Sequence, residues 1–320
     1  MNLLVTGANG FVGSRVLAAL AQQAGLTATG SVRQTAAGKK NAPGYWATGC
    51  LNGQTDWSNA TKGVDCVVHT AARVHLVRDG AADPLAAFRR VNVQGTLNLA
   101  QQATAAGVRR LVFISSVKVH GEITALGEPF FADDASAPLD AYGISKMEAE
   151  HGLRSIAATT GMEVVIVRSP LVYGPGVKAN FQVMMRWLSR GIPLPLGAIH
   201  NQRSLVALDN LVDLIVTCTH HPAAANQTFL VSDGEDVSTT QLLRRLGQAM
   251  GKPARLIPVP SALLWAGAAL VGKPELAQRL CGSLQVDIAK TRQLLGWNPP
   301  ISIDEGLRRA AQGFVREAAV

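Results

Sequence analysis

A tyrosine and a lysine stand four residues apart in the run Tyr142-Gly-Ile-Ser-Lys146. If both lie on one helix, this spacing places their side chains on the same face. An ammonium group beside a phenol stabilises the phenolate, so the lysine would lower the pKa of Tyr142. Tyr142 would then exchange a proton with a hydroxyl or a carbonyl near neutral pH. Because Tyr-x-x-x-Lys is common by chance, its weight depends on the elements that position it.

One such element is a predicted strand, Arg110 to Ser116, that ends in Ser115-Ser116. Ligands bind at the carboxyl ends of strands in open α/β sheets. A serine hydroxyl at this edge would hold the same substrate oxygen as Tyr142. The spacing therefore predicts a serine, a tyrosine and a lysine around one reacting oxygen.

The N-terminal stretch predicts a binding site for a dinucleotide. A short apolar run, Leu3 to Val5, is followed by Gly7, Gly10 and Gly13, and then by apolar residues at helical spacing. Glycine permits positive φ and a close backbone approach, while the helix N-terminus offers N–H groups and a positive dipole end to an anion. The pyrophosphate of a dinucleotide is the natural occupant of such a turn.

The end of the second predicted strand, Leu26 to Arg33, bears on the choice of dinucleotide. An acidic residue at this place grips the adenosine ribose of NAD, whereas an arginine accommodates the 2′-phosphate of NADP. No Asp or Glu stands there, and Ser31 and Arg33 occupy the place instead. The pattern favours NADP over NAD, the alternative being an arginine that only lies on the surface. A third strand is predicted at Trp46 to Leu51, with its end near the adenine.

Strands alternate with helices over the first half of the chain, which predicts an α/β fold with a doubly wound parallel sheet. The run Val64 to Arg73 is a predicted buried strand whose final alanines would let the backbone lie against a cofactor. His69 in this strand is interpreted as a hydrogen-bonded structural histidine.

Composition narrows the possible partners. The chain has 320 residues, 48% hydrophobic and 16% charged, which indicates a folded globular protein. The net charge is +8 and the pI is about 9.6. Because no run of lysine and arginine is longer than two, we expect an anionic small substrate and no nucleic acid.

The four cysteines show no metal-ligand spacing, so we expect no metal. A strand begins almost at Met1, which predicts a cytoplasmic protein without a signal peptide.

The most apolar stretch of the chain is Ser261 to Gly272. It is too short to span a bilayer, so stable membrane insertion is not expected. The stretch predicts a packed helix, with interfacial membrane contact as the alternative.

Several motifs in order resemble those of the extended short-chain dehydrogenase/reductases, in the NAD-dependent epimerase/dehydratase family that acts on nucleotide sugars. The likeness covers nearly the whole chain. Its motifs are Thr6-Gly-Ala-Asn-Gly-Phe-Val-Gly13, His69-Thr-Ala-Ala72, Asn92-Val-Gln-Gly-Thr96, Ser115-Ser116, Tyr142-Gly-Ile-Ser-Lys146 and Arg168-Ser-Pro-Leu-Val-Tyr-Gly-Pro-Gly176.

The resemblance implies residue roles. Tyr142 is the acid/base, Lys146 holds both the tyrosine and the nicotinamide ribose, and Ser116 orients the substrate. The implied substrate contacts are Lys118, Asn180, Arg203 as a phosphate clamp, and Arg279. The expected cofactor contacts are Gly7, Asn9, Gly10, Phe11, Val12, Gly13, Ser31, Arg33, Leu51, Thr70, Ala71, Ala72, Asn92, Ser115, Tyr142 and Lys146.

The resemblance also implies an organisation in two parts. Residues 1–170 would form the Rossmann domain, which binds NAD or NADP and carries the catalytic residues. Residues 171–320 would form a smaller α/β portion that binds the UDP-sugar, from which the chain can cross back to the sheet. A homodimer is expected from the family.

Three reactions share this scaffold: 4-epimerisation, 4,6-dehydration and reduction of a 4-keto sugar. Dehydratases carry an Asp-Glu pair after the serine or threonine, where this chain has Val117-Lys118, so dehydration is not expected. The Ser31/Arg33 strand end and the run Ile114 to Glu122 favour reduction of a UDP-4-keto-6-deoxy-N-acetylhexosamine for bacterial surface polysaccharide. A UDP-hexose or UDP-N-acetylhexosamine 4-epimerase is the alternative. A non-catalytic cofactor-sensing regulator is the alternative of another class.

Overall fold

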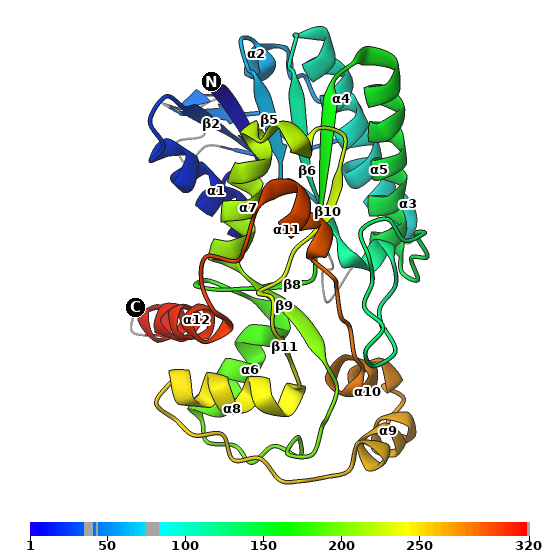
Figure 1. The fold of residues 1–320 in the computed structure, drawn as a ribbon, viewed down its shortest axis with the longest axis vertical. Coiled ribbons are helices and arrows are strands. Elements are labelled where there is room, and N and C mark those ends of the chain that lie inside the picture. Colours follow the sequence, from blue (N-terminus) through cyan, green and yellow to red (C-terminus); the bar gives the residue numbers. More distant parts are fainter. Residues whose placement is uncertain (35–40, 43, 75–82, 319–320) are drawn as a thin grey trace.

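An eight-stranded sheet forms the centre of the larger part of the molecule (Figure 1). The computed structural model describes residues 1–34, 41–42, 44–74 and 83–318. The strand order is β10-β7-β6-β5-β1-β2-β4-β3, and all neighbours pair in parallel except β3 and β4. The strands are β1 (Asn2–Thr6), β2 (Thr27–Val32), β3 (Asn41–Ala42), β4 (Tyr45–Ala47), β5 (Cys66–His69), β6 (Arg110–Ser116), β7 (Glu163–Ser169) and β10 (Thr228–Leu230).

Two hydrophobic cores cover the two faces of this sheet. Leu3 and Val5 point into a core with α1 (Phe11–Ala21) and α7 (Leu208–His220), while Leu4 points into the opposite core. That second core holds α4 (Thr96–Ala105) and α5 (Ala141–Thr160), with α2 (Ser58–Thr61) at its edge. The alternation follows from the two-residue period of a strand. The sheet is therefore doubly wound, as predicted.

The smaller part of the molecule is built on a three-stranded sheet of order β11-β9-β8. Its strands are β8 (Leu171–Tyr173), β9 (Arg203–Ala207) and β11 (Asp236–Val237). The helices of this part are α6 (Ala179–Ser189), α8 (Thr239–Ala249), α9 (Ser261–Leu270), α10 (Pro274–Cys281) and α12 (Ile303–Ala318). Between β9 and β11 the chain returns to the main sheet as α7 and β10, and α11 (Ala289–Leu295) packs beside β10.

The structure agrees with the predicted strands to different degrees. Strand β6 has the predicted bounds, and β2 lies within the predicted range. The third predicted strand is wrong in extent, because β4 ends at Ala47 and Gly49 adopts φ +73° just beyond it. The apolar stretch forms a helix, α9, as predicted, but it is packed less than predicted: Leu264 packs against the core of the smaller part, and none of the ten residues is fully buried.

Within the described residues, no helix is long and apolar enough to cross a membrane. In the same residues no three His, Cys, Asp or Glu side chains gather into a group that could hold a metal ion.

Candidate active site

The glycine turn joins β1 to α1 at the point where the strand order of the main sheet reverses, between β1 and β5. Gly7 adopts φ +67°, and a Cβ on it would lie 2.9 Å from the Cα of Ala71. A Cβ on Gly13 would lie 2.3 Å from the carbonyl oxygen of Gly7. Only glycine fits at these two positions, because backbone packs directly on backbone. The turn is thereby pressed against the loop that follows β5.

A cavity of about 460 Å³ opens over this turn. Nine of the residues predicted to contact a cofactor line it: Gly7, Asn9, Gly10, Ser31, Arg33, Leu51, Thr70, Ala71 and Ala72. Sequence reasoning missed the others: Val32, Thr48, Gly49, Cys50, Trp57, Arg73, Val74 and Val91. The run Thr48 to Cys50 belongs to the third predicted strand, of which only the end, Leu51, is a predicted contact. In the structure the chain turns at Gly49, and the whole run lines the cavity.

The cavity has the features that a dinucleotide requires. Gly10 is the N-cap of α1 and has no side chain to cap the helix, so first-turn N–H groups are open to an anion. Among the described residues that line the cavity, none is acidic. Ser31 Oγ lies 2.8 Å from the hydroxyl of Thr48, which ties the end of β2 to the segment after β4. Arg33 is a cationic side chain at this end of the cavity.

Tyr142 and Lys146 lie on the first turns of α5, whose N-cap Asp140 accepts a hydrogen bond from the backbone N–H of Gly143 at 2.7 Å. Lys146 is buried, and its Nζ donates to the carbonyl of Ile114 at 2.8 Å. That nitrogen lies 6.0 Å from the centre of the Tyr142 ring. The helix therefore brings the two groups to one face, as the spacing predicted.

Burial controls how this pair ionises. It lowers the pKa of Lys146 to about 7, although the nearby carboxylate of Glu150 opposes the shift. Burial also raises the pKa of Tyr142, and the negative charge of Asp140 adds to that effect. The predicted lowering of the tyrosine pKa is therefore wrong for this structure, because desolvation of the phenolate outweighs the lysine.

Ser116 is the last residue of β6, and its Oγ accepts from the backbone N–H of Lys118 at 3.2 Å. Ser115 faces the other side of the sheet, because successive strand residues alternate. Its hydroxyl donates to Glu150 at 2.6 Å, so this side chain is held inside the protein rather than in the cavity wall.

Other predicted cofactor residues support the cavity without lining it. Phe11, Val12 and Gly13 form the first turn of α1. Asn92 is buried, accepts from the backbone N–H of Arg73 at 2.8 Å and donates to its carbonyl at 3.0 Å. It thereby shapes the loop after β5. Asn92 lies in a π-helical segment, η1 (Arg89–Gly95), that follows α3 (Pro84–Phe88).

His69 is structural, as interpreted from the sequence. Its two ring nitrogens lie 2.6 Å from the hydroxyl of Thr6 and 2.9 Å from the hydroxyl of Thr96. Burial lowers the pKa of His69 to about 3, with a smaller effect from Lys146. The ring is therefore neutral and joins β1 and β5 to α4.

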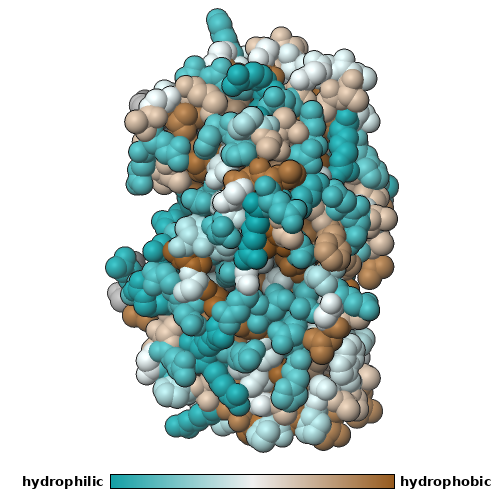
Figure 2. Space-filling model, viewed as in Figure 1, coloured by the Kyte–Doolittle hydropathy of each residue, from teal (hydrophilic) through white to brown (hydrophobic). Residues whose placement is uncertain are grey.

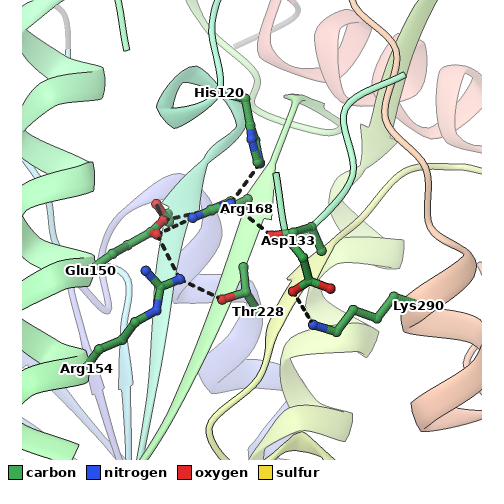
Figure 3. Close-up of polar contacts among 9 residues, drawn as sticks. His120, Asp133, Glu150, Arg154, Arg168, Thr228 and Lys290 are labelled. Carbon is green, nitrogen blue, oxygen red and sulfur yellow. Dashed lines mark hydrogen bonds and ion pairs between the residues drawn. The ribbon is translucent and has the colours of Figure 1, made fainter. Parts of the chain in front are cut away.

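A buried ionic cluster lies between α5 and β7 (Figure 3). Glu150, one turn beyond Lys146, accepts from Arg168 Nη2 at 2.6 Å and is fully buried. Arg168 in turn donates to His120 Nε2 at 2.8 Å and to the carbonyl of Ala132 at 3.1 Å. Burial, followed by the charge of Arg168, lowers the pKa of His120 to about 4. The cluster links α5, β7 and the segment after β6.

The predicted substrate residues lie on the side of the smaller part. Lys118 forms ion pairs with Glu122 and Asp140, so two carboxylates already balance its positive charge. Asn180 is exposed on the first turn of α6. Arg203 begins β9 and donates to the carbonyls of Gly282, at 3.0 Å, and Arg279, at 3.3 Å. The guanidinium of Arg203 therefore lies against the backbone of Arg279.

Comparisons with known proteins agree with the fold and with the family resemblance of the sequence. The sequence model described as "NAD dependent epimerase/dehydratase family" matches residues 3–232. A relative from Vibrio cholerae named UDP-glucose 4-epimerase is 48% identical over 98% of this chain and 96% of its own length. The solved UDP-glucuronic acid 4-epimerase from Bacillus cereus, in complex with UDP-glucuronic acid and NAD, has a TM-score of 0.78 at 22% identity, covering 99% of this chain and 100% of its own. RMD from Pseudomonas aeruginosa complexed with NADPH has a TM-score of 0.75 at 22% identity, covering 98% of each chain. The predicted Rossmann-type fold is confirmed.

Proposed function

This chain belongs to the NAD-dependent epimerase/dehydratase family, and we propose that within it the chain interconverts the C4 epimers of a UDP-hexose. One observation carries the proposal: the Vibrio cholerae relative, 48% identical across 98% of this chain, is named a UDP-glucose 4-epimerase. The retained Ser116, Tyr142 and Lys146 support a catalyst over a cofactor-sensing regulator, because a sensor has no need of all three.

Each of these three residues has a role at the C4 oxygen. Tyr142 takes the proton from the C4 hydroxyl and later returns it, and the Ser116 hydroxyl hydrogen-bonds to the same oxygen. Lys146, on the same helix face, orients the tyrosine and the nicotinamide ribose. A nicotinamide dinucleotide, when bound, supplies the acceptor and donor of the C4 hydride. The glycine turn and the cavity-lining residues would hold it, with its pyrophosphate at the N-terminus of α1.

The substrate end of the site supports a nucleotide sugar. Arg203 lies against the backbone of Arg279, and a guanidinium group can bind two oxygens of a diphosphate at once. The two residues after Ser116 are Val117 and Lys118, so no carboxylic acid directly follows the serine to eliminate water. Lys118 is itself paired with the carboxylates of Glu122 and Asp140. These features favour chemistry at C4 without dehydration.

A 4-keto reductase is the second candidate, and the end of β2 favours it. Ser31 and Arg33 line the cavity, and no acidic side chain is found in the part of its lining that the structure describes. This arrangement suits the 2′-phosphate of NADP, an exchangeable cofactor that a reductase consumes at each turnover. An epimerase regains its own hydride and benefits from NAD that stays bound.

An assay of the purified protein separates the candidates. UDP-glucose, and in parallel UDP-N-acetylglucosamine, is incubated without added NADPH, and the C4 epimer is followed by NMR. Formation of UDP-galactose or UDP-N-acetylgalactosamine supports the epimerase. Oxidation of NADPH with a UDP-4-keto-6-deoxy sugar, and no epimer from either substrate, supports the reductase. Cofactor binding without turnover of any UDP-sugar would overturn both and support the regulator.

A further inference from the structure

The helices α9 and α10, joined by Val271 to Lys273, form what we call the apolar hairpin. Leu263, Leu270 and Val271 are 63%, 88% and 68% exposed. Trp265 is 40% exposed, and α9 carries no charged side chain. A helix that is apolar on all sides is normally buried in a protein core or in lipid. Exposed apolar patches of this kind mark interaction surfaces.

The hairpin is attached to the protein through the end of α10 and through Leu264 of α9, which packs against the core of the smaller part. Ala277 is buried, Asn201 Nδ2 donates to the carbonyl of Gly282 at 2.8 Å, and Thr239 Oγ1 donates to that of Leu280 at 2.7 Å. Helix α9 instead lies at the lower edge of the molecule, away from both sheets (Figure 1). Figure 2 shows pale and brown residues gathered at the same edge. These contacts hold α10 on the protein and leave most of α9 exposed to solvent.

Charge decides what kind of partner fits this surface. Along the chain, the exposed cations Lys252 and Arg255 precede α9, Lys273 joins it to α10 and Arg279 lies on α10, whereas Glu275 is the one carboxylate between residues 251 and 282. The whole chain carries +8. A second copy would bring the same positive charge to the interface and be repelled. An anionic surface with an apolar interior would satisfy both the cations and α9.

We propose that the apolar hairpin docks this protein on an anionic lipid bilayer. Helix α9 lies in the interface between headgroups and acyl chains, and Arg255 and Lys273 meet the lipid phosphates. Trp265 lies at headgroup level, the depth that tryptophan favours. The ten residues of α9 are too few to span the bilayer, so the attachment is peripheral. This inference does not depend on which sugar reaction the site catalyses.

Vesicle flotation with the full-length protein tests the proposal. Vesicles of phosphatidylcholine with and without phosphatidylglycerol are compared, at low and at high salt. We expect binding to the vesicles that contain phosphatidylglycerol, a decrease of binding with salt, and little binding to phosphatidylcholine alone. The double variant Leu263→Ser/Leu270→Ser should bind at least about tenfold more weakly. Lys273→Glu should weaken binding to the anionic vesicles severalfold.

The control is Leu294→Ser/Val315→Ser, which removes two exposed apolar side chains from α11 and α12 and should bind as the wild type does. Cofactor binding and turnover in buffer, unchanged in all variants, would show that folding and the sugar reaction are unaffected. The proposal is overturned if the wild type does not float with anionic vesicles, or if the α9 variant floats equally well. It is also overturned if that variant only converts a dimer to a monomer, because α9 would then be a protein interface.

Discussion

Tyr142 shows how a buried site sets the properties of a single side chain. The i, i+4 spacing with Lys146 brings the two groups to one face of α5, but burial raises the pKa of the phenol instead of lowering it. The same burial lowers the pKa of Lys146 to about 7. In this structure the proton therefore stays on Tyr142, and the phenol must lose it before it can accept the proton of the C4 hydroxyl.

The substitution Tyr142→Phe removes this proton and little else. We expect kcat to fall by about 10²–10⁴-fold, because general acid–base catalysis contributes that much. The thermal unfolding midpoint and cofactor binding should stay near the wild-type values. Tyr45→Phe, on β4 and outside the cavity lining, is the matched control and should keep full activity. Equal turnover by Tyr142→Phe and the wild type would remove Tyr142 from the proposed mechanism.

A substitution of the single residue Arg33 tests whether the protein prefers NADP to NAD. If its guanidinium binds the 2′-phosphate, Arg33→Ala should weaken NADPH binding about tenfold or more and leave NAD binding nearly unchanged. Isothermal titration with both dinucleotides measures the difference. A loss of equal size for NAD and NADPH would show that Arg33 does not read the 2′-phosphate.

Among the structural elements, the turn between β1 and α1 shapes the predicted cofactor site. Gly13 lies in the first turn of a helix, where alanine would ordinarily be preferred. The close approach of the Gly7 carbonyl excludes alanine at position 13, because a Cβ there would lie 2.3 Å from that oxygen. The glycine spacing is thus a packing requirement as well as a binding motif.

Gly13→Ala should destabilise the protein by about 1–3 kcal/mol, as overpacking does, and should weaken cofactor binding. Gly267→Ala is the matched control, because a Cβ on this exposed helical glycine meets no atom within 4 Å. It should be neutral or stabilise by up to about 1 kcal/mol. Urea denaturation and cofactor titration measure both effects. Comparable unfolding free energies for the two variants would contradict the packing argument.

Helix α5 depends on the buried pair of Glu150 and Arg168. Glu150→Gln leaves the Arg168 charge buried without its carboxylate, which should cost about 3–5 kcal/mol. Glu148→Gln, two residues earlier on the helix, breaks an ion pair with the half-exposed Arg89 and should cost less than about 1 kcal/mol. Urea denaturation of both variants gives the comparison. Similar losses would show that the buried pair is not a major support of the catalytic helix.

At the scale of the whole molecule, the two parts share one core. Leu208, Leu211 and Phe229 from the second half pack in the same core as Leu3 and Val68 from the first. Strand β10 pairs with β7 at the edge of the main sheet. A boundary at residue 170 therefore divides the chain without dividing the core.

We expect the fragment of residues 1–170 to unfold without cooperativity, because it lacks α7 and β10 and exposes the face of the sheet that they cover. The full chain should unfold in a single transition by calorimetry. Co-expression with residues 171–320 should restore a cooperative transition if the halves reassemble. A fragment of residues 1–170 that melts sharply alone and binds NAD would show an autonomous domain.

The sequence by itself determined the features that depend on short spacings. The glycine turn, the strand ending in Ser115-Ser116 and the Tyr142/Lys146 pair are local patterns, and alternating strands and helices were enough to predict a doubly wound sheet. Only the tertiary structure decided what depends on distant partners. The pKa of Tyr142 follows from burial, Ser115 is held by Glu150 from another element, and α9 remains uncovered although its composition predicted packing. The physical reason is that desolvation and packing depend on which surfaces the whole chain brings together, and local spacing does not contain that information.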